Sequence, residues 1–149
     1  MIKDVIIKNL IKNEDERGWL AEIFRNDEVE THPVMGYVST TKPGIVRGPH
    51  EHVNQTDVFA FIGPGTVELN LWDRRENSKT NREHMKIEAG ENNPIMVIVP
   101  PGIVHAYKCI GNKDAWCINL PDKLYKGEGK KKETDEIRWE NKENSPYKL

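Results

Sequence analysis

The sequence lacks the features that mark several large classes of protein. It has only two cysteines, Cys109 and Cys117, and their spacing matches no common zinc or redox motif, so we expect no disulfide framework. No apolar run reaches 18 residues, which argues against a membrane-spanning helix. Residues 1–8 mix charges into an apolar run and lack a small-residue cleavage site, so we expect no signal peptide. A cytoplasmic protein without membrane contact is therefore expected.

Neither sign of charge is in large excess. The chain has 22 Lys and Arg against 24 Asp and Glu, a formal charge of −2, so it has no general basic field for nucleic acid. An anionic ligand must then be held by a few well-placed cations. A chain of 149 residues is long enough for one domain with a real core but short for two. We therefore expect residues 1–149 to form a single domain with one active centre.

Short β-rich runs between turn residues dominate the chain, and candidates for helix are weak. Val67, Leu69 and Leu71 alternate with Glu68, Asn70 and Trp72, the period-two pattern of a strand with one buried face. The sequence predicts strands near residues 5–7, 19–24, 35–40, 58–62, 66–72, 95–99 and 116–120. Short strands separated by turns indicate an all-β sandwich or barrel.

The C-terminal part of the chain differs in composition from the predicted strands. Residues 122–134 are charged and contain glycine, so we expect a mobile loop. Residues 135–139 are expected to form a closing strand or an anchor, and residues 140–149 a frayed tail. Trp19 is expected in the core.

Two histidine-containing motifs are the most informative feature. The first is Arg47-Gly48-Pro49-His50-Glu51-His52, and the second is Pro100-Pro101-Gly102-Ile103-Val104-His105. Two histidines one residue apart on an extended segment project to the same side. His105 can join them only if the fold brings distant strands together, as a small barrel does. The sequence therefore predicts a pocket lined by imidazoles inside a β-barrel.

These motifs and their neighbours resemble the dTDP-4-dehydrorhamnose 3,5-epimerase family. The matching landmarks occur in the family's order over residues 14–140. They are residues 15–19, 45–50, 73–78 and 99–105. The resemblance implies a cupin jelly-roll barrel, usually a homodimer. It also implies a nucleoside-diphosphate 4-keto-6-deoxysugar as substrate and no cofactor.

The resemblance also implies roles for the motif residues. His50 matches the base that removes the proton next to the C4 ketone, and imidazole, with an ordinary pKa of about 6.5, suits that step. Arg47 is permanently charged and fork-shaped, which suits a diphosphate or enolate oxygen. His105 matches a second histidine of the family's pocket and is expected to assist Arg47.

Substrate-binding residues follow from the same resemblance. Arg17, Glu22 and Arg25 match positions where family members grip nucleotide and phosphate, sometimes across the dimer interface. Asn119 and Tyr125 lie in a stretch that also resembles these epimerases, and Tyr125 is expected to offer an aromatic face to the nucleotide base.

Three positions depart from the family pattern. A lysine that polarises the C4 oxygen is replaced by Thr56 or Asp57, and the tyrosine that acts as general acid falls near 118–119, where no phenol exists. The aspartate that orients the base lies in a C-terminal segment that this chain is expected to lack. We therefore expect Asp57 or His52 to orient His50, and His52 or water to return the proton. Epimerisation at a single carbon is expected more readily than the double reaction.

Three alternatives stay open on the sequence. Sugar-nucleotide 3,4-ketoisomerases carry a similar Arg-Gly-x-His-x-His motif, and two adjacent imidazoles suit a proton shuttle. His50, His52, Asp57 and His105 also have the spacing of cupin metal ligands, which suit zinc, manganese, iron or nickel. The departures from the family pattern also allow a barrel that binds sugar nucleotides without turning them over.

Overall fold

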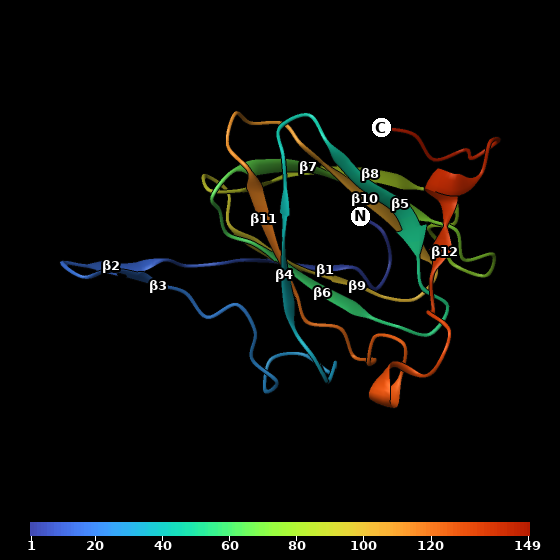
Figure 1. The fold of residues 1–149 in the computed structure, drawn as a ribbon, viewed down its shortest axis with the longest axis horizontal. Helices are drawn as coiled ribbons and strands as arrows, with labels where there is room; N and C mark the ends of the chain where they lie inside the picture. The colour runs from blue at the N-terminus through green and yellow to red at the C-terminus, as the bar shows by residue number, and fades with distance from the viewer.

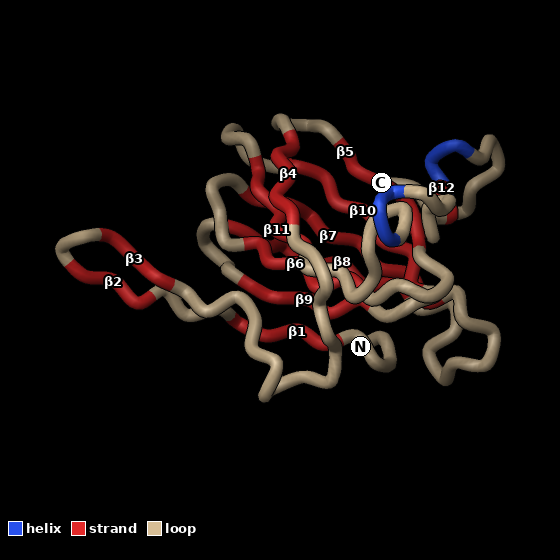
Figure 2. Tube along the Cα trace, turned by 60° about the horizontal axis from the view of Figure 1, so that its bottom comes forward, coloured by secondary structure: helices blue, strands red, loops and turns tan.

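The computed structural model describes residues 1–149 as two facing five-stranded antiparallel sheets (Figures 1 and 2). The first sheet has the order β1-β9-β6-β11-β4. Its strands are β1 (Ile6–Asn9), β4 (Tyr37–Thr41), β6 (Asp57–Phe61), β9 (Ile95–Val99) and β11 (Ala115–Asn119). The second sheet has the order β12-β5-β10-β7-β8. Its strands are β5 (Val46–Glu51), β7 (Thr66–Asp73), β8 (His84–Gly90), β10 (Ile103–Cys109) and β12 (Ile137–Arg138). The predicted all-β jelly-roll architecture is confirmed.

The main core lies between the two sheets and contains 16 buried residues. Val67, Leu69 and Leu71 of β7 belong to it, which confirms the inward face that the alternating pattern predicts. Phe59 and Phe61 of β6 enter the same core from the opposite sheet. Burying such side chains contributes about 1.5–3 kcal/mol each, so the facing sheets hold the walls of the barrel in place.

Strands β6 and β9 are buried along their whole length because the outer face of their sheet is also covered. Val58 and Met96 point to that outer face and pack in a second apolar cluster. Ile23 and Phe24 cover this cluster. The strand predicted over residues 19–24 therefore ends early: only Gly18–Leu20 forms a strand, β3, and the residues after it pack across the sheet.

A two-stranded hairpin projects from the sandwich (Figures 1 and 2). It consists of β2 (Asn13–Asp15) and β3. Ile11, Trp19 and Leu20 are 73%, 50% and 65% exposed, so the expectation that Trp19 lies in the core is wrong. Its ring instead faces Lys12, whose Nζ is 4.9 Å from the ring centroid. The hairpin thus presents apolar side chains with no cover from its own chain.

The C-terminal segment closes the second sheet. Strand β12 pairs with β5, which confirms the predicted closing strand. Glu51 is fully buried, and its Oε1 accepts hydrogen bonds from Arg74 Nε and Trp139 Nε1. Tyr147 packs edge-on against Trp139. Two 3₁₀ turns, η1 (Glu128–Lys130) and η2 (Trp139–Asn141), flank β12. The mobility expected of residues 122–134 and 140–149 stays a prediction.

No helix in the structure has the length and apolar character needed to cross a membrane.

Candidate functional site

Pairing of β5 with β10 builds the histidine site. The register places His50 opposite His105 and Arg47 opposite Tyr107, with an irregularity between these pairs. Three positions on β5 therefore match two on β10, as in a β-bulge. Cross-strand partners share a face of the sheet, so Arg47 and His50 lie on one face although they are three residues apart. Gly48 makes this possible: its φ is +84°, and a Cβ there would lie 2.6 Å from the His105 carbonyl oxygen.

Three imidazoles converge at this point. The ring centroids of His50 and His105 are 4.4 Å apart, and His52 lies 6.1 Å from the first and 5.9 Å from the second. One ring nitrogen from each lies within 4.8 Å of the others. The structure therefore brings together all three histidines that the sequence motifs single out.

His52 is held by oxygen atoms on both sides. Its Nε2 is 3.2 Å from Asp57 Oδ2, and its Nδ1 contacts the Asp135 carbonyl oxygen. Burial opposes charge on His52, but the hydrogen bond with Asp57 and the charge of that carboxylate raise the pKa of His52 above its ordinary value. Burial likewise opposes charge on Asp57, yet contact with His52 lowers the pKa of Asp57 to about 2. The two side chains therefore form a buried ion pair.

His105 is neutral and has one unpaired nitrogen. Its ring is fully buried, and burial lowers its pKa. Nδ1 donates to the Ile103 carbonyl oxygen at 3.1 Å, so the neutral ring carries its lone pair on Nε2. That atom has no hydrogen-bond partner and faces Asp57 Oδ2 at 3.5 Å. Two acceptors at this distance offer a place for a donor from a ligand.

His50 lies beside a carboxylate that the sequence analysis did not identify. Burial and the nearby His105 and His52 lower the pKa of His50 to about 2, so its ring keeps a free lone pair at neutral pH. Its side chain is 20% exposed, and its Nδ1 is 3.8 Å from Glu136 Oε1. The expectation that Asp57 or His52 orients His50 is wrong: Asp57 contacts His52 and His105. The chain does have an acidic group in its C-terminal segment, and it is a glutamate.

Asp135, the neighbour of Glu136, anchors this segment to the site. Its carboxylate accepts hydrogen bonds from the backbone amides of three consecutive residues, Val53, Asn54 and Gln55. Strand β12 then pairs Arg138 with His50, and Arg138 Nη2 lies 2.7 Å from Glu136 Oε2. The signal in the sequence was the acidic pair at the start of residues 135–139.

Asn119 lies where the family's tyrosine was expected. Its side chain is hydrogen-bonded to the phenol of Tyr37 on the neighbouring strand β4. Its Nδ2 donates to Asp57 Oδ1 at 2.8 Å and to the Tyr37 hydroxyl at 2.9 Å. Asn119 Oδ1 is buried without a partner. Tyr37 lies directly opposite Asn119 in the pairing of β4 with β11, a contact that the sequence analysis missed.

The remaining candidates do not contact the histidines within one chain. Arg47 bonds to β4 through Thr41 Oγ1 and the Thr40 carbonyl oxygen. Arg17 pairs with Asp15 at the tip of the projecting hairpin. The other three candidates, Glu22, Arg25 and Tyr125, are exposed. Glu22 pairs with Arg25 at 3.2 Å. The backbone amide of Tyr125 donates to Met35 Sδ.

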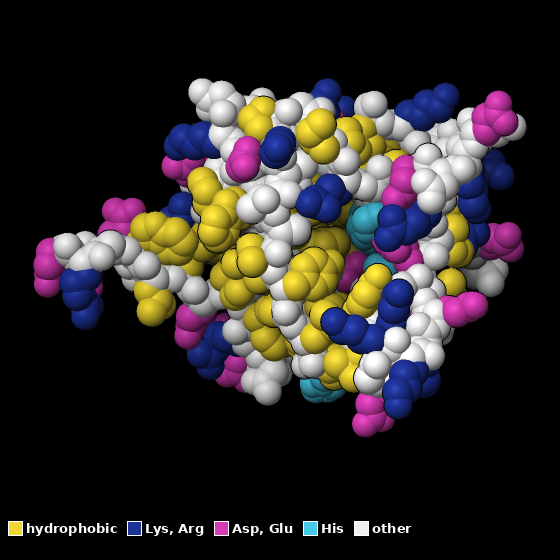
Figure 3. Space-filling view, in the orientation of Figure 1, with side chains coloured by type: hydrophobic (Ala, Val, Ile, Leu, Met, Phe, Trp, Pro, Cys, Tyr) yellow, Lys and Arg dark blue, Asp and Glu magenta, His cyan; other side chains and the backbone are white.

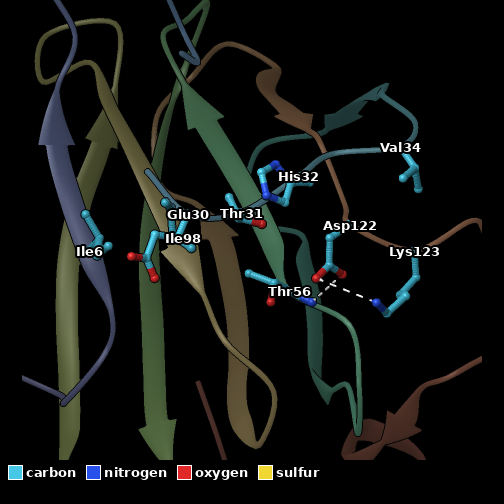
Figure 4. A pocket seen from close by; sticks show the side chains of 9 residues that line it. All are labelled: Ile6, Glu30, Thr31, His32, Val34, Thr56, Ile98, Asp122 and Lys123. Atoms are coloured by element: carbon cyan, nitrogen blue, oxygen red, sulfur yellow. Dashed lines mark hydrogen bonds and ion pairs between the residues drawn. The ribbon is translucent and has the colours of Figure 1, made fainter. Parts of the chain in front are cut away.

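Side chains of several kinds surround the exposed histidines of the molecule. Figure 3 shows histidine side chains reaching the surface among hydrophobic, acidic and basic ones. A separate groove of about 500 Å³ lies elsewhere, beside β1 and β9. His32, Asp122 and Lys123 line it (Figure 4), and the Thr56 amide donates to Asp122 there. This groove contains none of the three clustered histidines.

The histidine cluster has the ligand types that borderline transition metals prefer, and the unpaired His105 Nε2 suits a ligand atom. One ligand nitrogen from each ring lies within 4.8 Å of the others. His50, His52 and His105 could therefore hold a metal, with Asp57 as a fourth ligand in place of its contact with His52.

A family model described as dTDP-4-dehydrorhamnose 3,5-epimerase matches residues 1–144. The chain belongs to this family. It is therefore an isomerase, a carbohydrate epimerase acting on a nucleotide sugar. The resemblance carried by the histidine motifs is confirmed.

Relatives agree with this epimerase family. The chain is 38% identical over 127 residues to the probable low-salt glycan biosynthesis epimerase Agl13 of Haloferax volcanii, covering 83% of this chain and 81% of the relative. It is 37% identical over 112 residues to the spore coat polysaccharide biosynthesis protein SpsL of Bacillus subtilis, covering 74% of each. A dTDP sugar isomerase from Desulfovibrio desulfuricans superposes with a TM-score of 0.83 at 20% identity, covering 99% of this chain and 91% of that one. This last likeness supports the cupin fold.

Proposed function

We propose that this epimerase inverts a single carbon next to the ketone of a nucleoside-diphosphate 4-keto-6-deoxysugar, with His50 as the base. The observation that carries the proposal is the position of His50, whose side chain is 20% exposed and faces the carboxylate of Glu136. A neutral imidazole accepts the α-proton, and Glu136 stabilises the imidazolium that forms. The 3.8 Å separation of the two groups shortens as charge develops, as catalytic contacts often do once substrate binds.

The other groups divide the remaining work. Arg47 shares the inward face with His50 and supplies a permanent positive charge for the enolate oxygen or the diphosphate. His105 differs from the earlier expectation, because its neutral Nε2 is an acceptor. It receives a substrate hydroxyl rather than stabilising an enolate oxygen. The positive charge of His52 stays paired with Asp57.

Ketoisomerisation is the second candidate function, suggested by the two histidines of the first motif. It needs a second imidazole that is free to carry a proton between neighbouring carbons. Both nitrogens of His52 face oxygen atoms of the chain, which argues against such a shuttle. Appearance of a 3-keto product from dTDP-4-keto-6-deoxyglucose would favour this alternative over epimerisation.

We also propose that the enzyme is a homodimer and that the projecting hairpin reaches the partner. Exposed Ile11, Trp19 and Leu20 give the hairpin an apolar surface that burial against a second copy would stabilise. Arg17 at its tip would then approach the partner's pocket, while Glu22, Arg25 and Tyr125 would border the nucleotide. Sedimentation velocity checks the assembly: a monomer at micromolar concentration contradicts it.

Solvent deuterium tests the function directly. Wild-type protein incubated with dTDP-4-keto-6-deoxyglucose in D₂O should introduce deuterium at C3 or at C5 and form one epimer, both followed by NMR. His50→Asn should abolish incorporation, while the matched change His84→Asn, in a histidine stacked on Trp72, should leave it unchanged. Saturable binding of dTDP with no exchange in wild-type protein would instead indicate a non-catalytic barrel.

The proposal also covers the cofactor requirement of the reaction and its cellular compartment. We propose that the reaction needs no cofactor and takes place in the cytoplasm, where nucleotide sugars are made. Elemental analysis of purified protein before and after a chelator wash tests the first point. A stoichiometric transition metal whose removal stops turnover would favour the metal-dependent alternative at His50, His52, Asp57 and His105.

A further inference from the structure

We propose that Tyr37 is the catalytic acid that returns a proton to the sugar carbon on the face opposite His50. This inference rests on the proposed function, because it assigns the second half of the same epimerisation. It concerns a residue outside both histidine motifs, on a strand that the sequence analysis treated only as a structural element.

Epimerisation needs a base and an acid on opposite sides of the sugar, and strands β5 and β4 satisfy this requirement. A carbon is inverted only when the proton leaves from one face of the sugar and another arrives at the opposite face. His50 lies on β5 of the second sheet, and Tyr37 lies on β4 at the edge of the first sheet. Base and phenol therefore come from opposite walls of the barrel.

A chain of contacts joins the phenol to the histidine cluster. Asn119 Nδ2 donates to the Tyr37 hydroxyl oxygen at 2.9 Å and to Asp57 Oδ1 at 2.8 Å. Asp57 Oδ2 lies 3.5 Å from His105 Nε2, and His105 packs edge-on against His50. Because Asn119 donates to the Tyr37 oxygen, the phenol proton is not needed for this contact and is free to point into the pocket. Asn119 acts here as a positioning residue.

The protonation state of Tyr37 suits an acid. Burial raises the pKa of Tyr37 to about 12, with a smaller contribution in the same direction from the charge of Asp57. The phenol therefore keeps its proton at neutral pH. Tyr37 as a whole is nevertheless 47% exposed, so a substrate can approach it. The unpaired Asn119 Oδ1 gives a substrate hydroxyl an acceptor next to this phenol.

The proposed step balances in protons and charge. His50 Nε2 or Nδ1 takes the α-proton, and the electrons of the broken C–H bond form the enolate. The enolate carbon then takes the proton of the Tyr37 hydroxyl on its other face, restoring the ketone and leaving a phenolate. Water reprotonates the phenolate, and the imidazolium of His50 gives its proton to solvent.

Tyr37→Phe separates the two half-reactions. In D₂O, His50 can still remove a proton and return a deuteron on the same face, so exchange with retained configuration should fall less than about 5-fold. Formation of the epimer should fall at least about 100-fold, the size of a general-acid contribution. Tyr147→Phe is the matched control, since Tyr147 packs against Trp72 and Trp139 away from the histidines. A thermal melt checks that Tyr37→Phe, which keeps the ring, stays folded.

The outcomes are distinguishable. Epimer formation by Tyr37→Phe within about 3-fold of wild type overturns the role of Tyr37 alone. A parallel loss of exchange and epimer also overturns it, because Tyr37 would then act in binding or enolisation. Wild-type protein that neither exchanges nor epimerises the sugar overturns the proposed function as well.

Discussion

Two buried carboxylates of this protein show how a structural polar cluster differs from a functional one. Asp73 and Asp57 are 2% and 1% exposed, and both are ionised by contact with nearby donors. Arg75, Ser78 and Thr80 donate to Asp73, and all of them lie within seven positions of it in the sequence. Asp57 instead has partners in three separate segments: His52 just after β5, His105 in β10, and Asn119 in β11, which is 62 positions away.

The two clusters also differ in how completely their polar atoms are paired. No unpaired buried side-chain atom lies among the donors of Asp73, whereas His105 Nε2 and Asn119 Oδ1 beside Asp57 have no partner. An unpaired buried polar group costs about 1–3 kcal/mol, so the histidine site is less stable than its closed counterpart. The open atoms are the ones available to a ligand. We therefore expect changes at Asp73 to affect stability and changes around Asp57 to affect activity.

Asp73→Asn should have the largest effect. It removes the charge that pairs with Arg75 and accepts from two hydroxyls, and we expect a loss of about 3 kcal/mol in the free energy of unfolding. The activity per folded molecule should stay at the wild-type value. Urea denaturation and the deuterium assay check the two parts. Loss of turnover in fully folded Asp73→Asn would show that the Asp73 cluster is functional as well as structural.

The contribution of Asp73 should depend on pH. Burial opposes its charge, but the hydrogen bonds from Arg75, Ser78 and Thr80 hold the pKa of Asp73 below its ordinary value. A carboxyl whose folded-state pKa is lowered contributes stability above its unfolded pKa of about 3.9 and loses it as pH falls. The difference in stability between wild type and Asp73→Asn should therefore be constant from pH 5 to 8 and shrink below about pH 4.

Asp57→Asn should have the opposite profile. It leaves His52 without its ion-pair partner, but His52 can lose its proton, so the stability cost should be only about 1–2 kcal/mol. Epimer formation should fall about 100-fold because the support for Asn119 and the electrostatics of the cluster change together. A variant with wild-type turnover and a large loss of stability would place Asp57 with Asp73 as a structural group.

The contrast between local and distant partners also decides how much of each cluster could be predicted from the sequence. Residues 73–78 were recognised as a landmark of the family resemblance, and Arg75 and Ser78 in this stretch prove to be partners of Asp73. The shared side of His50 and His52 was predictable because strand periodicity acts locally, and the approach of His105 followed from the barrel that the sequence and the family resemblance implied. Glu136 and Tyr37 were missed because their places depend on the pairing of β12 with β5 and of β4 with β11. Such pairings between distant segments are not encoded in any local pattern.

The strand predictions show the same limit. The apolar run at residues 95–99 matches β9 to the residue, because a continuous apolar run suits a strand with both faces covered. Residues 19–24 fit the same rule, yet only the first two are in β3. Ala21, Ile23 and Phe24 pack on the outer face of the first sheet beside Met96, a tertiary contact that overrides β propensity.

Glu136→Gln should have an intermediate effect on the rate. We expect kcat to fall about 10- to 100-fold with KM unchanged, since the carboxylate stabilises the His50 imidazolium and does not contact the sugar. Glu140→Gln is the matched control: both glutamates lie near Arg138, at 2.7 and 3.7 Å, but only Glu136 faces His50. Equal rates for the two variants would show that Glu136 only pairs with Arg138.

We expect the smallest effects from removing one neutral hydrogen-bond donor from each cluster. Ser78 Oγ donates to Asp73 Oδ2 at 2.6 Å, and Gln55 Nε2 donates to Asp57 Oδ1 at 2.9 Å. Each alanine substitution removes the hydrogen bond to its carboxylate, and Ser78→Ala also removes the one that Ser78 Oγ accepts from the Thr80 amide. Each lost hydrogen bond should cost about 1 kcal/mol of stability. Ser78→Ala should leave kcat/KM unchanged, whereas Gln55→Ala should lower it about 3- to 10-fold, because Gln55 supports the Asp57 carboxylate that pairs with His52. Equal kcat/KM for both variants would mean that the histidine site tolerates loss of a donor as readily as the Asp73 cluster does.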